Sequence, residues 1–497
     1  MESKFEKKQI SCLKPLLEQV QWGEQTLEIR LPEGMPDVGQ VLTAWGQPIA
    51  RSKEWREESL HFSGGMMVWV LYLPEDGSEE RCIEGWIPFQ MRWELPENTR
   101  EGTMRLRCLP RFVDGRSTSP RKIMVRAGMS VLAEAFVPWK LDAAVPETMP
   151  EDVALLENTY PLLLSREAGE KTFRLEEELS IPDSAPGIER LISWRMEPKI
   201  ADRKVLGDKA AFRGSGNLHV LYRSPEGQIH AWDFELPFSQ YTDLQGEYGD
   251  HARMDIGLLP TSLELELVEG RLNLKSSMAA QYRVTDKVPL TLAEDAYSPL
   301  RELGITVEDL TPPVILENRQ ENLYGEQTIP AEANVTADVQ FLPDFPRQNR
   351  TGDGVQLEYP GQFQVLYYGE DGRLHGASAR WESSQTLPIG ENSRILAVPM
   401  GAAAQAVAGN GQIRMKAELP VELTAAGEPA IPMVTGVELG QQKQSDPSRP
   451  SLILRRAGKL PLWDLAKASG STMEAIRRAN GLTGEPAPEQ MLLIPVI

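Results

Sequence analysis

The sequence of 497 residues predicts a mainly β protein, with three tandem antiparallel β-sandwich-like domains and then a small module in the order strand, helix, helix, strand. Three observations support this fold class. A strand–turn–strand motif occurs three times, a second hairpin signal follows each copy, and the last 47 residues change to helical periodicity.

The repeated motif is an apolar run that ends in tyrosine, with a glycine five residues after that tyrosine in every copy. β-Branched and aromatic residues favour strands, and a glycine after a polar or acidic residue suits a turn that needs positive φ. Each copy is therefore expected to form a hairpin with a return strand. The runs and glycines are 67–72 with Gly77, 218–222 with Gly227, and 363–367 with Gly372, and the return strands are expected at 82–89, 230–238 and 375–381.

A second turn signal follows at Asp114-Gly115, Glu269-Gly270 and Asn410-Gly411. Its glycines lie 43, 48 and 44 residues after the respective tyrosines, so the repeat spans a whole domain. Around the second copy, leucines alternate with polar residues over 263–267 and 272–274. This alternation predicts an antiparallel sheet with one face in solvent.

A proline motif upstream relates the first two copies, because Pro32 and Pro36 recur as Pro182 and Pro186. The third copy keeps Pro330 but lacks the second proline, which predicts a diverged domain. A polar stretch before the last module is typical of a flexible tether, so the module is expected to swing freely. The predicted divisions are domain 1 at 1–155, domain 2 at 156–305, domain 3 at 306–434, a linker at 435–450 and the C-terminal module at 451–497.

The net charge of −20 disfavours nucleic acid and anionic membranes as partners. The charge is uneven, because the last 47 residues carry +2 and the preceding 450 carry −22. The C-terminal module could therefore face an acidic partner, although a surplus this small also arises by chance. The three cysteines lack CxxC spacing and are expected to be reduced thiols. The sequence contains no stretch of 18 apolar residues, so membrane insertion is not predicted.

Within the module, a short apolar run at 452–454 is the expected first strand. Pro461 suits the first position of a helix, and Gly470 is expected to end it. Ser471 with Glu474 forms a capping-box pattern for a second helix, which is expected to stop at Asn480-Gly481 before a strand at 491–495. Trp463 lies at helical spacing, where a core position is the first expectation and a binding surface the alternative.

The sequence contains no pattern that would identify an enzyme. The five histidines include no HExxH and have no nearby cysteine, and His219 is expected to be an ordinary strand residue. Residues 168–172 lack phosphate-loop spacing, no GxSxG occurs, and no carboxylate pair stands out. No catalytic residue, metal or cofactor is therefore predicted.

The C-terminal module resembles a LysM domain. The segments that carry this resemblance are 462–467, 470–472, 476–482 and 492–495. In that family, glycan is held between two loops, which correspond to 458–462 and 481–489. The usual Gly-Asp-Thr is replaced here by Gly458-Lys459-Leu460-Pro461, which loses an acidic and a hydroxyl side chain. This departure argues against sugar binding.

The β-repeat resembles the SPOCS domain of endospore-forming bacteria, through residues 181–183, 188–192, 220–222 and 234–241. Three such domains before a LysM domain is the layout of SipL-like spore coat morphogenetic proteins. The resemblance implies a non-enzymatic adaptor in the mother-cell cytoplasm, at the forespore surface, that holds the coat-basement ATPase and contacts other coat proteins.

The expected partner-binding residues are those of the two loops and the first helix. They are Lys459, Leu460, Trp463, Asn480, Gly481 and Leu482. The alternative left open by the sequence is a peptidoglycan-binding protein that uses the LysM groove.

Overall fold

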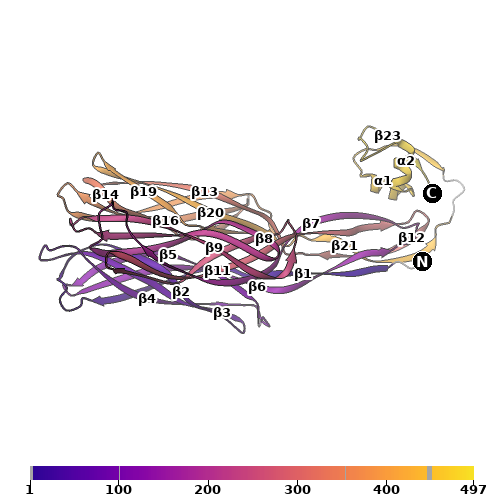
Figure 1. The fold of residues 1–497 in the computed structure, drawn as a ribbon. Coiled ribbons are helices and arrows are strands. Elements are labelled where there is room, and N and C mark those ends of the chain that lie inside the picture. The colour runs from indigo at the N-terminus through magenta and orange to yellow at the C-terminus, as the bar shows by residue number, and fades with distance from the viewer. Residues whose placement is uncertain (1–3, 100, 353, 445–449) are drawn as a thin grey trace.

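The computed structural model describes residues 4–99, 101–352, 354–444 and 450–497. The molecule is elongated (Figure 1). A broad head of β-sheets narrows into a stalk of paired strands, and the C-terminal module lies beside the far end of that stalk, near the N-terminus. The fold is mainly β, as the sequence predicts.

The first repeat consists of six antiparallel strands in two sheets. One sheet has the order β1-β6-β5 and the other β2-β3-β4. Inward-facing residues of both sheets, including Phe62, Trp93 and Leu106, form one core. The strands are β1 (Lys4–Arg30), β2 (Val38–Arg56), β3 (Ser59–Pro74), β4 (Arg81–Glu94), β5 (Thr103–Ser119) and β6 (Lys122–Thr148).

The second repeat has the same arrangement, with β7-β11-β10 in one sheet and β8-β9 in the other. The long β8 folds back on itself: the backbone N–H of Glu189 donates to the carbonyl of Arg223, and Asp202 pairs with Arg213. Its two arms thus take the places of β2 and β3. The strands are β7 (Ala154–Leu179), β8 (Arg190–Arg223), β9 (Ile229–Tyr248), β10 (Arg253–Val268) and β11 (Arg271–Tyr297).

The third repeat follows the same plan with interrupted strands. Both β14 and β15 pair with β16, and both β18 and β19 pair with β20. Pro346 lies in the first gap and Pro399 ends β18, where a missing N–H cannot continue a ladder. The strands are β12 (Arg301–Leu310), β13 (Val314–Pro330), β14 (Ala333–Pro343), β15 (Arg347–Thr351), β16 (Gly354–Gly369), β17 (Leu374–Leu387), β18 (Ser393–Pro399), β19 (Ala403–Gly409), β20 (Gln412–Gly427) and β21 (Ile431–Gln442).

Three two-stranded ribbons, one from each repeat, form the stalk (Figure 1). The outer parts of β1 and β6 pair, as do those of β7 and β11, and β12 pairs with β21. Ile10, Leu290 and Met433, one from each ribbon, share a small apolar core. In the third repeat, the ribbon is separated from the head by Pro312-Pro313 and Pro429.

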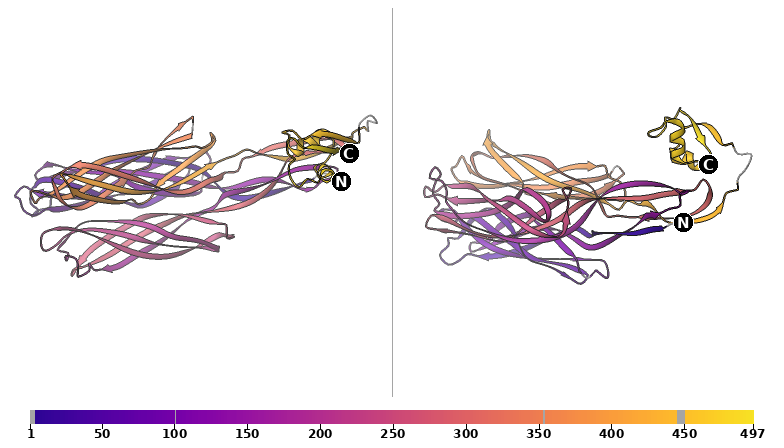
Figure 2. Two further views of the ribbon diagram at one scale, coloured as in Figure 1. Left: turned by 90° about the horizontal axis from the view of Figure 1, so that it is seen from above. Right: turned by 45° about the vertical axis from the view of Figure 1, so that its right-hand side comes forward.

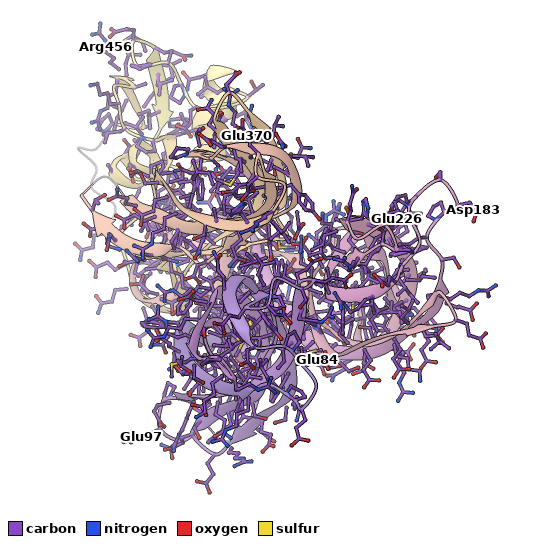
Figure 3. The ribbon with its side chains drawn as sticks, turned by 90° about the vertical axis from the view of Figure 1, so that its left-hand side faces the viewer. Glu84, Glu97, Asp183, Glu226, Glu370 and Arg456 are labelled. Carbon is purple, nitrogen blue, oxygen red and sulfur yellow. The ribbon has the colours of Figure 1, made fainter. Side chains whose placement is uncertain are left out.

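The strands of the three repeats form three lobes around a common centre, as the end-on view shows (Figure 3). The second lobe is set apart from the other two in the view from above (Figure 2). Trp69, Leu221 and Leu366, one from each repeat, belong to a single buried cluster. The repeats therefore share interior surface, because each lobe buries part of its surface against the others.

A group of charged side chains is buried between the first and second lobes. The Asp255 carboxylate lies 2.8 Å from Arg105 and 3.4 Å from Arg283, and Glu134 lies 3.7 Å from Arg105. All four side chains are less than one-tenth exposed. Arg107 joins this group, because it lies 3.7 Å from Asp255 and 3.9 Å from Glu422. Three cations and three carboxylates balance here, which is the condition under which charges tolerate burial.

The three predicted first hairpins are confirmed. Gly77, Gly227 and Gly372 adopt φ values of 71°, 87° and 70° between paired strands. Turns also form at Glu269-Gly270 and at Asn410-Gly411.

The turn expected at Asp114-Gly115 is wrong, because both residues lie inside β5, which continues to a turn at 120–121. A Cβ on Gly115 would meet Val70 at 3.2 Å. The glycine therefore allows β5 to pack closely against β3, and it does not reverse the chain.

The strands of the stalk cross the divisions that the sequence suggests. The position 155/156 lies within β7, 305/306 within β12, and 434/435 within β21. The expected linker at 435–450 thus begins as paired strand, and residues 445–449 lie outside the described part of the chain. In ribbons only two strands wide, most side chains face solvent, so the apolar pattern that marks a strand is weak.

Candidate partner-binding site

The C-terminal module has the order β22 (Leu452–Arg456), α1 (Leu462–Ser469), α2 (Met473–Asn480) and β23 (Met491–Pro495), and its two strands pair antiparallel. Pro461 precedes α1, and Gly470 ends it with φ 60°. The expected cap of α2 at Ser471 is wrong. Thr472 is the N-cap, and its hydroxyl accepts from the N–H of Ala475 at 3.1 Å, because Ser471 is buried.

Trp463 is buried against the stalk, with 4% of its surface exposed. Its ring meets that of Tyr297 edge-on at 4.7 Å, and its indole N–H donates to the Asp295 carboxylate at 2.8 Å. Lys467 pairs with the same carboxylate at 2.6 Å, and the Tyr297 hydroxyl donates to the carbonyl of Ser471 at 2.9 Å. The expectation that the module swings freely is therefore wrong, because α1 is docked on the end of β11.

The environment of this contact shifts two pKa values. Burial tends to raise the pKa of Asp295, but the bonds from Lys467 and Trp463 outweigh it and leave that pKa below its usual range. Burial, and then the nearby Asp295 charge, raise the pKa of Tyr297 to about 12. Asp295 therefore stays ionised and Tyr297 stays protonated at neutral pH.

Asn480 joins α2 to β23. Its side-chain amide donates to the carbonyls of Ile476 and Leu493, at 2.8 and 2.6 Å, and its carbonyl accepts from the N–H of Leu493 at 2.7 Å. Leu482 packs partly against the module core, and Gly481 closes α2 with φ 62°. These positions hold the module together.

The two loops expected to bind a partner lie side by side. The N–H of Gly458 donates to the carbonyl of Pro488 at 2.9 Å, and the N–H of Leu462 donates to the Glu485 carboxylate at 2.8 Å. Lys459 and Leu460 are exposed here. Of the six predicted partner-binding residues, Lys459, Leu460 and Gly481 thus lie at the surface, whereas Trp463, Asn480 and Leu482 make contacts within the molecule.

The stalk residues Asp295 and Tyr297 could not be predicted, because nothing near them in sequence marks them as a docking site. The outward face of the β22–β23 sheet, where several large apolar side chains are exposed, was not predicted either. A signal was present, since three consecutive apolar residues at 452–454 place apolar side chains on both faces of a strand.

The head contains a cavity of about 880 Å³ lined by all three repeats. At its wall, His219 lies 2.6 Å from Asp233 of its own repeat and 3.1 Å from Asp338 of the third, which also pairs with Arg195. His219 lies in β8, as expected of a strand residue. In the described ranges, no His, Cys, Asp and Glu side chains form a group that could hold a metal ion.

The three cysteines are free thiols, in agreement with the sequence. Burial raises the pKa of Cys82 and of Cys108 to about 12, so both remain protonated and unreactive. Within the described ranges, the helices are too short or too polar to pass through a bilayer.

Comparison with known proteins gives one match. Residues 187–266 match the family model described as SipL, SPOCS domain. No curated protein and no solved structure matches the chain significantly. The matched segment contains β8, β9 and most of β10, so the second repeat is similar to the SPOCS domain of SipL.

Proposed function

We propose that this chain is a non-enzymatic adaptor of spore coat assembly with tandem SPOCS domains. The match of residues 187–266 to the SipL SPOCS domain carries the proposal. The first repeat shares a specific contact with the matched one: Tyr222 donates to the carbonyl of Pro186 at 3.0 Å, and Tyr72 donates to that of Pro36 at 3.1 Å. This shared contact supports extending the SPOCS assignment to the first repeat, and the common strand order supports extending it to the third.

The C-terminal module acts, in this proposal, as a LysM domain that holds the coat-basement ATPase. The order of its elements and the loop pair at 458–461 and 481–490 support this assignment. The head then contacts other coat proteins at the forespore surface, in the mother cell. The placement of the module at the end of the stalk, away from the lobes, supports a division of roles between the two ends (Figure 1).

Copurification from sporulating cells tests the proposal. The full chain is expected to retain the coat-basement ATPase, and a chain ending at residue 444 is expected to lose it while keeping its other partners. Retention of the ATPase by the shortened chain would assign that role to the head. Failure of both chains to retain any coat protein would contradict the proposed function.

A second candidate function is glycan binding, which is favoured by the adjacency of the two loops. The aromatic ring of the module, Trp463, is buried on the stalk and offers no face to a sugar. Sedimentation with purified peptidoglycan distinguishes the two functions. Saturable retention of the full chain that is lost on deleting residues 451–497 would favour the glycan.

A further inference from the structure

The β22–β23 sheet has helices on one face only. Leu492 and Ile494 point inward and are fully buried, whereas their neighbours in β23 point outward. Leu454 lies directly opposite Leu493 in the strand pairing, and Arg456 lies opposite Met491. The outward side chains of the two strands therefore form one continuous surface, which we call the sheet face. Its exposed apolar members are Leu452, Leu454, Met491 and Leu493, and the exposed Ile497 lies two residues beyond β23.

Exposed apolar residues are concentrated on this module. Among the described residues, six of the nineteen large apolar side chains that are exposed belong to the last 47 residues. Five of the six are on or beside the sheet face, and Leu454 is 64% exposed. Scattered single apolar residues are normal on a surface, but a contiguous group on so small a unit is typical of an interaction site.

The stalk leaves the sheet face open. The module docks through Trp463 and Lys467 of α1, and β23 lies on the opposite side of the module (Figure 1). Arg456 stands at the outer edge of the molecule in the end-on view (Figure 3). A macromolecule could therefore reach the sheet face without displacing the module from the stalk.

The charges around the sheet face restrict the partner. Arg456 lies on the sheet face opposite Met491 and is paired with Glu489 at 3.0 Å in an exposed ion pair. The exposed Arg455 and Lys459 belong to the other side of β22 and to the loop after it, and they make no ion pair with any described residue. The module carries +2 while the rest of the chain carries −22. A partner with an apolar strip flanked by carboxylates would complement both the apolar sheet face and the positive charge of the module.

We propose that the sheet face is the surface through which the module binds its protein partner, and that the partner presents an apolar strip flanked by acidic side chains. This inference rests on the proposed function and adds the surface involved. Aliphatic side chains and methionine suit a protein interface, in which methionine and arginine are enriched. A glycan is a poorer fit, because the sheet face offers no aromatic ring on which a sugar could stack.

Affinity measurements on the full chain test the sheet face, with the purified coat-basement ATPase as probe. Leu454→Glu and Leu493→Glu should each weaken binding about tenfold or more, the scale of an interface hot spot. The control is Val407→Glu, an exposed apolar residue of the head, which should leave the affinity within about twofold. Leu460→Glu, in the loop that the sequence predicts to bind the partner, tests the loops instead. Arg456→Glu, which reverses the charge on the sheet face itself, should weaken binding and reduce its dependence on salt.

Each other outcome overturns the inference in a distinct way. Wild-type affinity of Leu454→Glu and Leu493→Glu, with loss in Leu460→Glu, would move the contact to the loops and leave the proposed function intact. No binding by the unaltered chain would overturn both proposals. A dimer of the full chain that Leu454→Glu dissolves, seen by light scattering, would assign the sheet face to self-association. Leu454→Ser serves as the second variant if thermal melting shows that glutamate unfolds the module.

Discussion

At the residue scale, Asp255 brings together the buried arginines at the joint between the first two lobes. Its carboxylate faces Arg105, Arg107 and Arg283. Burial tends to raise the pKa of Asp255, but these guanidinium groups hold it far below its usual range. The carboxylate thus contributes stability at pH values above the unfolded pKa of about 3.9, and this contribution is lost as the pH falls toward the folded pKa.

We expect Asp255→Asn to lower the free energy of unfolding by about 3–5 kcal/mol at neutral pH, because it leaves buried arginines without their counterion. Urea denaturation measures the loss. Asp183→Asn, in an exposed turn of the same repeat, is the control and should change little. Equal stability of the two variants would contradict the role assigned to the buried charges.

His219 gives a second prediction, of the opposite sign in pH. Burial and Arg195 lower its pKa, but hydrogen bonds to Asp233 and Asp338 outweigh them and leave it raised above 6.5. The contact between His219 and Asp338 of the third repeat therefore contributes most stability below the pKa of His219 in the unfolded chain. This contribution is lost as the pH rises through the pKa of His219 in the folded protein. His219→Gln should lower the free energy of unfolding more at pH 5.5 than at pH 9, as measured by denaturant unfolding. His251→Gln, which changes an exposed histidine, is the control.

At the element scale, the tyrosine that ends the apolar run in each of the first two repeats is hydrogen-bonded to the turn before the second sheet. Tyr222→Phe and Tyr72→Phe should each cost about 0.5–1.5 kcal/mol, because each leaves a proline carbonyl without its donor. Tyr367 makes no such bond to any described residue, so Tyr367→Phe is the matched control. A loss of similar size in all three variants would show that the hydroxyl bond is not the cause.

Local elements were predictable from the sequence because their causes are local. The glycines Gly77, Gly227 and Gly372 require positive φ wherever the lobes lie, so the hairpins could be predicted from turn chemistry alone. The helix ends at Gly470 and Gly481 follow for the same reason. Of the predicted site, Lys459 and Leu460 do lie at the surface.

The remaining features depend on contacts between residues far apart in sequence. Gly115 was misread as a turn because the need for close packing against Val70 leaves no local mark. Trp463 and Asp295 are 168 positions apart, and neither neighbourhood indicates the other. The sequence predicts Asn480 as the end of a helix. The hydrogen bonds from its side chain to the backbone of Leu493 in β23 could be found only from the fold.

At the scale of the whole molecule, the docking of the module should depend on one carboxylate. Asp295→Ala removes the partner of both Trp463 and Lys467 without touching the module itself. We expect the module to remain folded but to leave the stalk, which small-angle X-ray scattering would record as a broader distance distribution. Asp286→Ala, on the same strand but outside the contact, is the control. An unchanged distribution would mean that Tyr297 alone holds the module.

Deleting residues 451–497 should leave the head and stalk folded. The module buries only the stalk's tip residues, among them Ala154, Leu156 and Tyr297, whereas each lobe keeps its own core. Thermal unfolding of the shortened chain should remain cooperative, with a similar midpoint. Loss of cooperativity would show that the module completes the fold.

The pairing of β12 with β21 has a mechanical consequence. Once the contacts of Trp463 and Lys467 with β11 are released, tension applied to the module enters the stalk at Gln442, the last residue of β21, and runs along that strand. The hydrogen bonds to β12 are perpendicular to that pull, so they would have to rupture together and not one after another. The ribbon is therefore loaded in shear, which lets a narrow pair of strands transmit force between the head and whatever the module holds.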